Sequence, residues 1–328
     1  MATLYVVEQG ALVAKKGERL LVRKDGKILR DVPLVHVERV VLLGNVHLTT
    51  PALVSLLEKG VDVALLSSRG TFRGKIQPPW AKDARLRQQQ YAAYQEPERR
   101  LDLARRFVVG KLRNMIALWK RQRKCRELGT AVGELQRLAR KAGEAGDLAK
   151  LRGYEGTAGA IHFRAFRMSL ARDLGFRRRA HRPPTDPVNA LLSLGYTLLH
   201  NEFYALTTMV GLDPYLGFYH EVKHGHPALA SDLMEEWRPV VVDFLVLGLI
   251  NRGELRSAHF RKPRNGIRLT HEGFEIFLKA YERRLTAKVM HPRARERLTY
   301  RQCLEAQVRH LAAYLRGKGA AYEPFHWR

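Results

Sequence analysis

The tripeptide Pro78-Pro79-Trp80 divides this chain of 328 residues into two parts that differ in apolar periodicity. A Pro-Pro pair lacks two backbone donors and restricts the residue before it, so it can continue neither a helix nor a central strand. The length is sufficient for two domains and a large core. We therefore expect one domain over residues 1–80 and a second over residues 81–328.

The part before this break has the pattern of short strands. Its apolar runs are rich in Val and Leu and are separated by turn signals. The expected strands are Leu4–Val7, Ala11–Ala14, Arg19–Arg23, Lys27–Leu29, Val37–Leu43, Val61–Leu66 and Thr71–Ile76. Asp25-Gly26 is expected to form a type I′ hairpin turn, in which both central residues have positive φ. One helix interrupts the strands, with Thr50 as its cap, Pro51 at its first position and Gly60 just past its end.

The part after the break is helical from about Ala84. Its apolar residues recur every three or four positions, as on one face of a helix. The clearest stripe consists of Leu101, Ala104, Phe107, Val108, Leu112, Met115, Ile116 and Trp119. Residues 269–285 and 299–316 have the same period, with Thr270 and Thr299 as expected caps. The last residues, Gly317–Arg328, have no period and are expected to be irregular and mobile.

These patterns predict an α+β protein of two domains, a small β-rich N-terminal domain followed by a larger all-α domain. The apolar run Val240–Ile250 is broken by Asp243 and is too short to span a bilayer. The first residues lack the pattern of a secretory signal, and Cys125 and Cys303 are best explained as buried packing residues. We expect a cytoplasmic protein with no membrane partner.

The chain is strongly basic, with 58 Lys and Arg against 32 Asp and Glu and a formal net charge of +26. Residues 1–80 hold 12 Lys and Arg against 7 Asp and Glu, a net charge of +5, which leaves +21 for the rest. A polyanion such as DNA is the expected partner. A generally basic composition without such a partner is the alternative.

Acids are therefore scarce, yet residues 217–239 set three histidines just before three acids. The histidines are His220, His224 and His226, and the acids are Asp232, Glu235 and Glu236. Carboxylates suit Mg²⁺ and Mn²⁺, and an imidazole favours Mn²⁺. If a helix begins at residue 231 or 232, the three acids share one face. The alternative is dipole compensation at a helix N-terminus together with a salt bridge to Arg238.

Two other stretches are candidates for function. Glu155 stands among glycines and small residues, either as an accessible carboxylate or as a first-turn residue of a helix. Arg177, Arg178, Arg179 and Arg182 precede a proline-rich break, where they form either a phosphate contact or a solvated basic loop. The chain has no Gly-rich phosphate loop and no Gly-x-Ser-x-Gly elbow, and two cysteines cannot build a structural zinc site.

Several of these motifs, in this order, resemble the CRISPR-associated adaptation integrases, the Cas-one family. The matching stretches are Tyr154-Glu155-Gly156 with Phe163 and Phe166, then Arg182–Ser193, Gly211–His220 and Asp232–Pro239. The resemblance implies a β-rich N-terminal domain that favours dimerisation and a helical domain that carries catalysis and DNA binding. It implies a Mg²⁺ or Mn²⁺ site built from Glu155, His220 and Glu235, with Asp232 as a supporting acid. In some relatives the third ligand is Asp, so Glu235 is a modest departure.

The resemblance also implies an activity. Members of the family insert spacer DNA into a CRISPR array, where a DNA 3′-hydroxyl attacks a phosphodiester without ATP, and they also act as metal-dependent nucleases. They work as homodimers that flank a dimer of the small protein Cas-two in a heterohexamer. Two alternatives stay open on the sequence. One is a stand-alone metal-dependent nuclease for branched or other DNA, and the other is a DNA-binding protein without catalysis.

Overall fold

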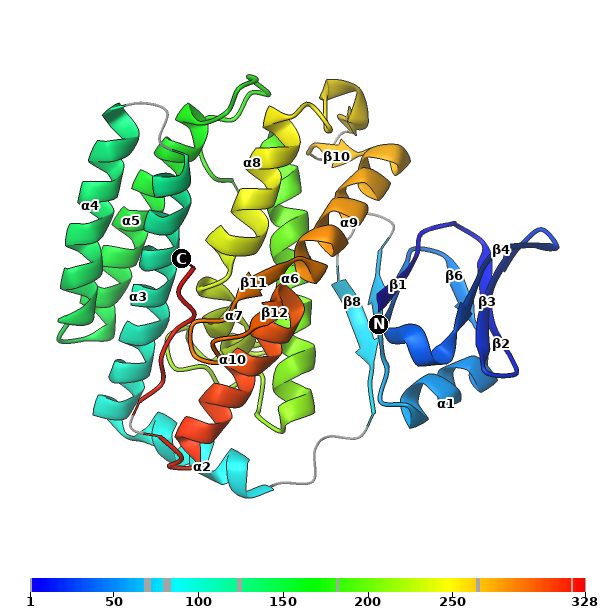
Figure 1. Cartoon of the computed structure of the whole chain (residues 1–328), viewed down its shortest axis with the longest axis horizontal. Coiled ribbons are helices and arrows are strands. Elements are labelled where there is room, and N and C mark those ends of the chain that lie inside the picture. Colours follow the sequence, from blue (N-terminus) through cyan, green and yellow to red (C-terminus); the bar gives the residue numbers. More distant parts are fainter. Residues whose placement is uncertain are drawn as a thin grey trace. The chain divides into compact units, whose positions relative to one another are not determined.

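The computed structural model describes residues 2–67, 72–78, 84–122, 126–180, 183–263, 266–319 and 321–327. The chain separates into two compact units, Met1–Trp80 and Ala81–Arg328. Pro79 and Trp80, which gave the predicted break, lie outside the described residues. Each unit has its own architecture (Figure 1), and the predicted fold class, β-rich and then largely helical, is confirmed.

The first unit consists of two four-stranded sheets and one helix. In the first sheet, β5 (Val37–Leu43) lies parallel to both β1 (Ala2–Val6) and β7 (Asp62–Leu66), and β8 (Phe72–Ile76) closes the edge antiparallel to β7. The second sheet has the order β4-β3-β2-β6, formed by β2 (Ala11–Lys16), β3 (Arg19–Lys24), β4 (Lys27–Pro33) and β6 (Val46–Leu48). Apolar side chains from both sheets form one core with α1 (Thr50–Glu58).

Most local predictions for this unit are confirmed, and one is shifted by a residue. Asp25 and Gly26 have φ of 48° and 75°, as a type I′ turn requires. The side chain of Thr49, not Thr50, caps α1 by accepting a hydrogen bond from the Ala52 N–H. β6 was not predicted, because it has only three residues and pairs in parallel with β2. Thr71, the predicted start of β8, lies outside the described residues.

The second unit is built from helices that pack side by side. Three of them form one layer, α3 (Pro97–Arg121), α4 (Arg126–Gly143) and α5 (Leu148–Met168) (Figure 1). The others are α2 (Ala84–Gln95), α6 (Pro187–Val210), α7 (Ala228–Glu235), α8 (Phe244–Asn251), α9 (His271–Thr286) and α10 (Tyr300–Leu315). Two short ribbons add to them, β9 (Phe260–Arg261) with β10 (Arg268–Leu269) and β11 (Lys288–Met290) with β12 (Arg297–Thr299). No described helix has the length and apolar character needed to cross a membrane.

Side-chain caps fix where several of these helices begin. The carboxylate of Asp186 accepts from the Asn189 N–H ahead of α6, and Pro187 occupies the first position of that helix. Thr270 and Thr299 cap α9 and α10, as the sequence predicts. Between α7 and α8 the chain makes a π-helical turn over Arg238–Asp243, a rare geometry that is frequent at functional sites.

The C-terminal strap, residues 321–327, is irregular but firmly packed. Tyr322, Phe325 and Trp327 are buried. Asn114 of α3 donates to the Phe325 carbonyl at 2.9 Å and accepts from the Trp327 N–H at 2.9 Å. The prediction of a mobile C-terminus is therefore wrong for the strap, because its aromatic side chains fill the core of the helical unit.

Candidate metal centre

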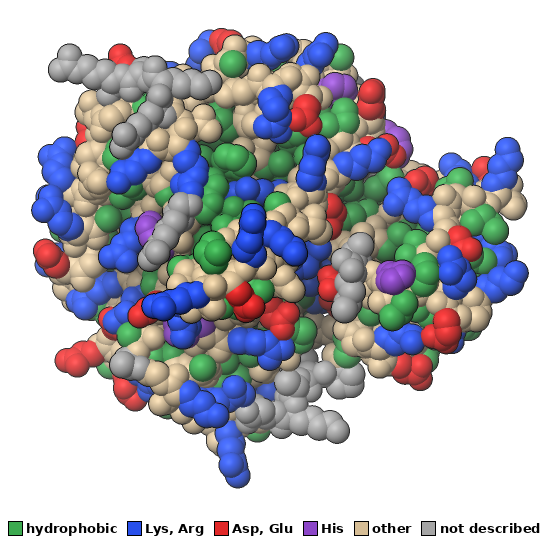
Figure 2. Space-filling view, in the orientation of Figure 1, with side chains coloured by type: hydrophobic (Ala, Val, Ile, Leu, Met, Phe, Trp, Pro, Cys, Tyr) green, Lys and Arg blue, Asp and Glu red, His purple; other side chains and the backbone are tan. Residues whose placement is uncertain are grey.

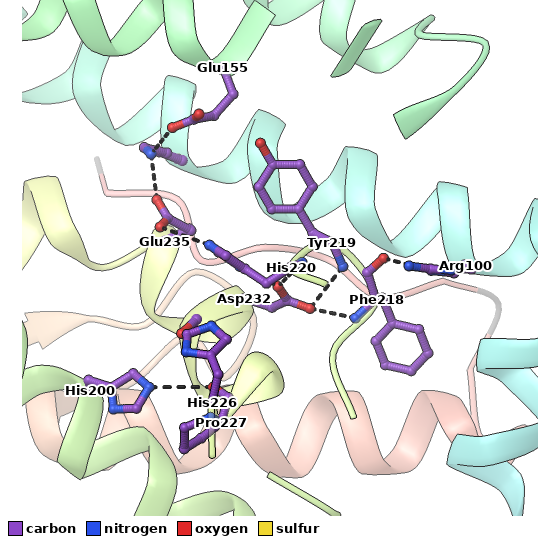
Figure 3. Close-up of polar contacts among 12 residues, drawn as sticks. Arg100, Glu155, His200, Phe218, Tyr219, His220, His226, Pro227, Asp232 and Glu235 are labelled. Carbon is purple, nitrogen blue, oxygen red and sulfur yellow. Dashed lines mark hydrogen bonds and ion pairs between the residues drawn. The ribbon is translucent and has the colours of Figure 1, made fainter. Parts of the chain in front are cut away.

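Two carboxylates from different helices face each other across one buried lysine. Glu155 projects from α5 and Glu235 from the end of α7 (Figure 3). The Lys111 ammonium of α3 forms an ion pair with Oε1 of Glu155 and lies 2.5 Å from Oε2 of Glu235. The Lys111 side chain is 7% exposed and that of Glu235 is 3% exposed. The structure thus brings two of the predicted metal ligands together, with a cation between them.

The third predicted ligand, His220, lies beside Glu235 and is held by Asp232. The Nδ1 atom of His220 is 2.7 Å from Oδ1 of Asp232, and its Nε2 atom is 4.0 Å from Oε1 of Glu235. An ionised carboxylate only accepts hydrogen bonds, so Nδ1 carries the proton that is shared with Asp232. Burial acts to lower the pKa of His220, but the Asp232 and Glu235 carboxylates raise it overall. Once the ring is neutral, the Nε2 lone pair is available as a metal ligand.

Asp232 is fully occupied by internal hydrogen bonds. Its carboxylate accepts from the backbone N–H groups of Phe218, Tyr219 and His220 at 2.6, 3.0 and 2.9 Å, besides the His220 ring. Its side chain has no exposed surface. The Asp232 carboxylate therefore holds both the loop and the His220 imidazole in place.

The helix that carries these acids begins earlier than predicted. α7 starts at Ala228, so Asp232 and Glu235 lie in its C-terminal half, where the helix dipole disfavours anions. The alternative explanation by dipole compensation is wrong. The positive charge that stabilises Glu235 comes from side chains instead. Arg238 Nη1 lies 2.6 Å from Oε1 of Glu235, and this contact is the salt bridge predicted from the sequence.

The pKa values follow this balance of charges. Burial favours the neutral form of Glu235, but Arg238, Lys111 and His220 outweigh it and hold the pKa of its carboxyl well below its usual range. Burial also acts to lower the pKa of Lys111, yet the Glu235 and Glu155 carboxylates raise it overall. The centre therefore holds an ionised Glu235 carboxylate and a charged Lys111 ammonium.

Glu236, the third acid of the cluster, faces away from the centre. It accepts hydrogen bonds from the Tyr322 hydroxyl and, at 2.7 Å, from the Phe325 N–H of the C-terminal strap. Burial raises the pKa of Glu236 to about 8. The expectation that three acids share one face is thus correct only for Asp232 and Glu235.

The surroundings of Glu155 are open. α5 begins at Leu148, so Glu155 lies beyond the first turn, and its interpretation as a helix N-terminal residue is wrong. A Cβ atom added at Gly153, Gly156 or Gly159 would meet no atom within 4 Å. The Glu155 side chain is 24% exposed. The sequence expectation of an accessible carboxylate matches this arrangement.

The remaining histidines of the motif differ from each other. His224 is exposed, whereas the His226 ring lies 6.0 Å from the His220 ring and 6.5 Å from the His200 ring, between centroids. Burial lowers the pKa of His226 and, more strongly, that of His200, to about 4. His226 therefore lies beside two other imidazole rings, although it belongs to the loop before α7.

The described arginines of residues 177–182 fall into two groups, exposed side chains and one that is bonded to α6. Arg177 and Arg178 are exposed, and Arg182 lies outside the described residues. The Arg179 guanidinium instead donates to Asn189 at 2.8 Å and to Ser193 at 3.1 Å, so it holds the loop against α6. Figure 2 shows Lys and Arg side chains over much of the visible face, with Asp and Glu between them.

A divalent ion fits the chemistry of this donor set. Among the described residues, no three His, Cys, Asp or Glu side chains are already grouped to hold an ion. The reason lies in the centre itself, because the Lys111 ammonium occupies the space between Glu155 and Glu235. Oε2 of Glu235 is buried and already faces a cation, the Lys111 ammonium at 2.5 Å. Glu155, His220 and Glu235 thus supply oxygen and nitrogen donors suited to Mg²⁺ or Mn²⁺.

Lys111 is the residue of this centre that the sequence analysis did not select. It lies four positions after Phe107 and four before Met115, both of which are buried on the apolar stripe of α3. A lysine on such a stripe must bury its charge beside an acid. The position of Lys111 on this apolar stripe was therefore the feature of the sequence that could have identified it.

Comparison with known proteins agrees with this arrangement. Residues 4–283 match the family model described as CRISPR associated protein Cas1. The chain is 40% identical over 328 residues to a CRISPR-associated endonuclease Cas1 of Thermus thermophilus. The alignment covers 99% of this chain and 97% of the relative. A solved CAS1 protein from Thermotoga maritima superposes with a TM-score of 0.86 at 26% identity, covering 97% and 99% of the two chains.

A second solved structure, a Cas6-RT-Cas1–Cas2 complex, is similar with a TM-score of 0.83 at 26% identity, covering 99% of this chain and 36% of that one. Its matching portion therefore has the same fold. The family match, the full-length identity to the Thermus protein and the fold agree with the motifs around Glu155, His220 and Glu235. On these grounds the chain belongs to the Cas1 family of CRISPR-associated endonuclease and integrase proteins.

Proposed function

We propose that Glu155, His220 and Glu235 bind Mg²⁺ or Mn²⁺ and form the active site with which this chain cuts and joins DNA. The observation that carries the proposal is the approach of two carboxylates and an imidazole from α5, α7 and the loop before α7, around a cation position. Such clusters of perturbed, charged groups mark active sites more often than structural sites.

The protein groups would prepare this site before DNA arrives. Asp232 keeps the proton of His220 on Nδ1 and directs Nε2 toward Glu235. Arg238 offsets the charge of Glu235, which keeps that carboxylate ionised. A bound divalent ion supplies Lewis-acid activation of a phosphodiester and stabilises charge on the leaving oxygen.

The proposed reaction is a transesterification. The 3′-hydroxyl oxygen of a spacer precursor forms a bond to a phosphorus of the CRISPR repeat, and the bond from that phosphorus to its former 3′-oxygen breaks. One phosphodiester replaces another and the hydroxyl proton passes to the leaving oxygen through solvent, so ATP is not needed. With water as the nucleophile, the same site would hydrolyse DNA.

Partners are proposed on the same basis. The similarity to a Cas1–Cas2 complex supports a Cas2 partner, and the family resemblance suggests a homodimer of this chain on each side of a Cas2 dimer. We assign dimerisation to a domain of residues 1–80, and DNA binding with catalysis to a domain of residues 81–328. DNA as substrate would place the protein in the cytoplasm.

A strand-transfer assay tests the proposal. A supercoiled plasmid with a CRISPR repeat is incubated with a short duplex bearing free 3′-hydroxyls, the partner protein, and Mn²⁺ or EDTA. We expect metal-dependent joining by the wild type, which Glu155→Ala abolishes while DNA binding is largely retained, because phosphate contacts dominate affinity. Full activity of Glu155→Ala with an unchanged metal requirement would refute the site assignment.

The stand-alone nuclease is the second candidate, because the openness beside Glu155 also suits water as nucleophile. It predicts metal-dependent cleavage without joined product in the same assay. A DNA-binding protein without catalysis predicts neither product, and binding that is indifferent to both metal and Glu155.

A further inference from the structure

We propose that Lys111 is a resident counter-ion that exchanges with the divalent metal. In the absence of metal its ammonium neutralises Glu155 and Glu235, and metal binding displaces it from the space between them. The inference rests on the proposed function, because it takes the same two carboxylates as ligands.

The contacts of Lys111 place it where an ion must go. Its Nζ atom pairs with Oε1 of Glu155 and with Oε2 of Glu235, so one atom links ligands from two helices. Oε2 of Glu235 is buried, and the ammonium 2.5 Å away balances its charge. An ion that binds both carboxylates must take the position that the ammonium holds.

Charge balance explains why the two cations compete. The Glu155 and Glu235 carboxylates are matched by Lys111 and Arg238, so the four groups together are neutral. A divalent ion placed between the two carboxylates would lie within a few ångströms of the Lys111 ammonium, and the two cations would repel each other strongly in this largely buried site. Arg238 pairs with the opposite oxygen of Glu235, Oε1, so it can stay when Lys111 leaves.

The lysine also has a function of its own. Without a cation, two carboxylates would face each other in a largely buried site, where an uncompensated charge opposes folding. Lys111 would therefore keep the metal-free protein folded with its ligands already positioned. This arrangement weakens the apparent affinity for the metal, because the ammonium has to be displaced.

Metal affinity provides the first test. Binding of Mn²⁺ alone is measured by titration calorimetry for the wild type and for Lys111→Met, a side chain of similar length without charge. We expect Lys111→Met to bind Mn²⁺ about tenfold or more tightly, because no ammonium has to leave. We also expect Mn²⁺ to raise its melting temperature more than that of the wild type.

The matched control is Lys75→Met. Lys75 is also 7% exposed and pairs with Asp62 at 3.1 Å, but both residues belong to the first unit. Its loss should change stability and leave Mn²⁺ affinity as it was. If Lys111→Met does not fold without metal, Lys111→Gln keeps a neutral donor at the site and is measured in its place.

Amine labelling of the wild type provides a second test that needs no variant. An acetylating reagent followed by mass spectrometry reports how accessible each lysine is. Lys111 should be protected in EDTA and become modified in saturating Mn²⁺, whereas Lys150, 66% exposed, should be modified equally in both.

The outcomes distinguish the exchange from the proposed function. Unchanged Mn²⁺ affinity in Lys111→Met, or continued protection of Lys111 in a wild type that binds Mn²⁺ and joins DNA, would overturn the exchange alone. Failure of both the wild type and Lys111→Met to bind Mn²⁺ would overturn the exchange together with the proposed metal site.

Discussion

The Oδ1 atom of Asp232 accepts two hydrogen bonds from one residue, from Nδ1 of His220 at 2.7 Å and from the His220 backbone N–H at 2.9 Å. One carboxylate oxygen therefore fixes both the position and the tautomer of the candidate metal ligand. Partners of this kind around ligating histidines usually contribute about 10- to 100-fold in metal affinity or activity.

Asp232→Asn should therefore lower Mn²⁺ affinity by about 10- to 100-fold and reduce DNA cleavage with it. The amide has one acceptor oxygen and cannot serve three backbone donors and a ring nitrogen. Titration calorimetry measures the effect. The control is Asp213→Asn in the loop between α6 and α7, where the Asp213 carboxylate accepts from Tyr91 and from the Tyr215 N–H instead of from a candidate ligand. Equal reductions in both variants would show that Asp232 only stabilises the loop.

The three described arginines of the basic loop should behave differently. Replacing Arg177 or Arg178 with Ala should weaken DNA binding and lower the slope of log K against log salt by about one unit for each phosphate that is no longer bound. Arg179→Ala should instead lower the free energy of unfolding by about 1–3 kcal/mol, because its partners Asn189 and Ser193 lose their donor. Fluorescence anisotropy at several salt concentrations and urea unfolding measure the two effects. An unchanged salt slope for Arg177→Ala and Arg178→Ala would remove this loop from the DNA interface.

Two glycines near the centre should respond in opposite directions to alanine. In Gly217→Ala the new Cβ would lie 2.7 Å from the Ala228 carbonyl carbon and 2.8 Å from Oδ2 of Asp232. We expect a decrease of roughly 1–3 kcal/mol in stability and weaker Mn²⁺ binding, because Asp232 has to move. Gly156→Ala on α5 meets open space and should add about 0.5–1 kcal/mol through helix propensity. Urea unfolding of both variants measures these changes, and a stabilised Gly217→Ala would contradict the close packing at Asp232.

Acid should loosen the C-terminal strap through His310. The Nε2 atom of His310 accepts a hydrogen bond from the Glu323 N–H at 2.9 Å, so the neutral ring is required. Burial, with the charges of Arg293 and His291, lowers the pKa of His310 from 6.5 to about 4. The unfolded chain binds this proton below about pH 6.5 and the folded chain only near pH 4. The stabilisation present above pH 6.5 is thus lost as the pH falls through this window.

Urea unfolding between pH 7 and 5 measures this dependence, with a contribution from His310 of at most about 1.4 kcal/mol per pH unit. His310→Gln keeps an acceptor for the Glu323 N–H but cannot be protonated, so its slope should be smaller. His47→Gln, in the first unit, controls for the removal of a histidine. A slope in His310→Gln equal to that of the wild type would exclude His310 as the source.

Local signals predicted most of the fold. β5 has the predicted bounds Val37–Leu43, and Thr270 and Thr299 cap the helices that they were expected to cap. These features depend on a few neighbouring residues, which the sequence shows directly. β6 and the π-helical turn Arg238–Asp243 depend on distant packing, so no local pattern indicated them.

The candidate centre was predicted in part. The motif around residues 217–239 indicated His220, Asp232 and Glu235, and the structure places them together. The motif could not show that Glu236 faces the strap, because the direction of neighbouring side chains depends on where α7 begins. Nor did it reveal Lys111, whose partner Glu155 lies 44 residues away on another helix.

The docked strap has a consequence for synthesis of the protein. Asn114 receives its hydrogen bond from Trp327 across 213 residues of chain. At translation rates of about 5–20 residues per second, roughly 10 to 40 seconds pass between the appearance of these two residues. Within that interval Glu236 is made 89 residues before Phe325, and until then its carboxyl lacks the hydrogen bond from the strap. The helical unit can therefore complete its core only after the strap has been made, and chaperones that shield apolar surface would have their longest opportunity before then.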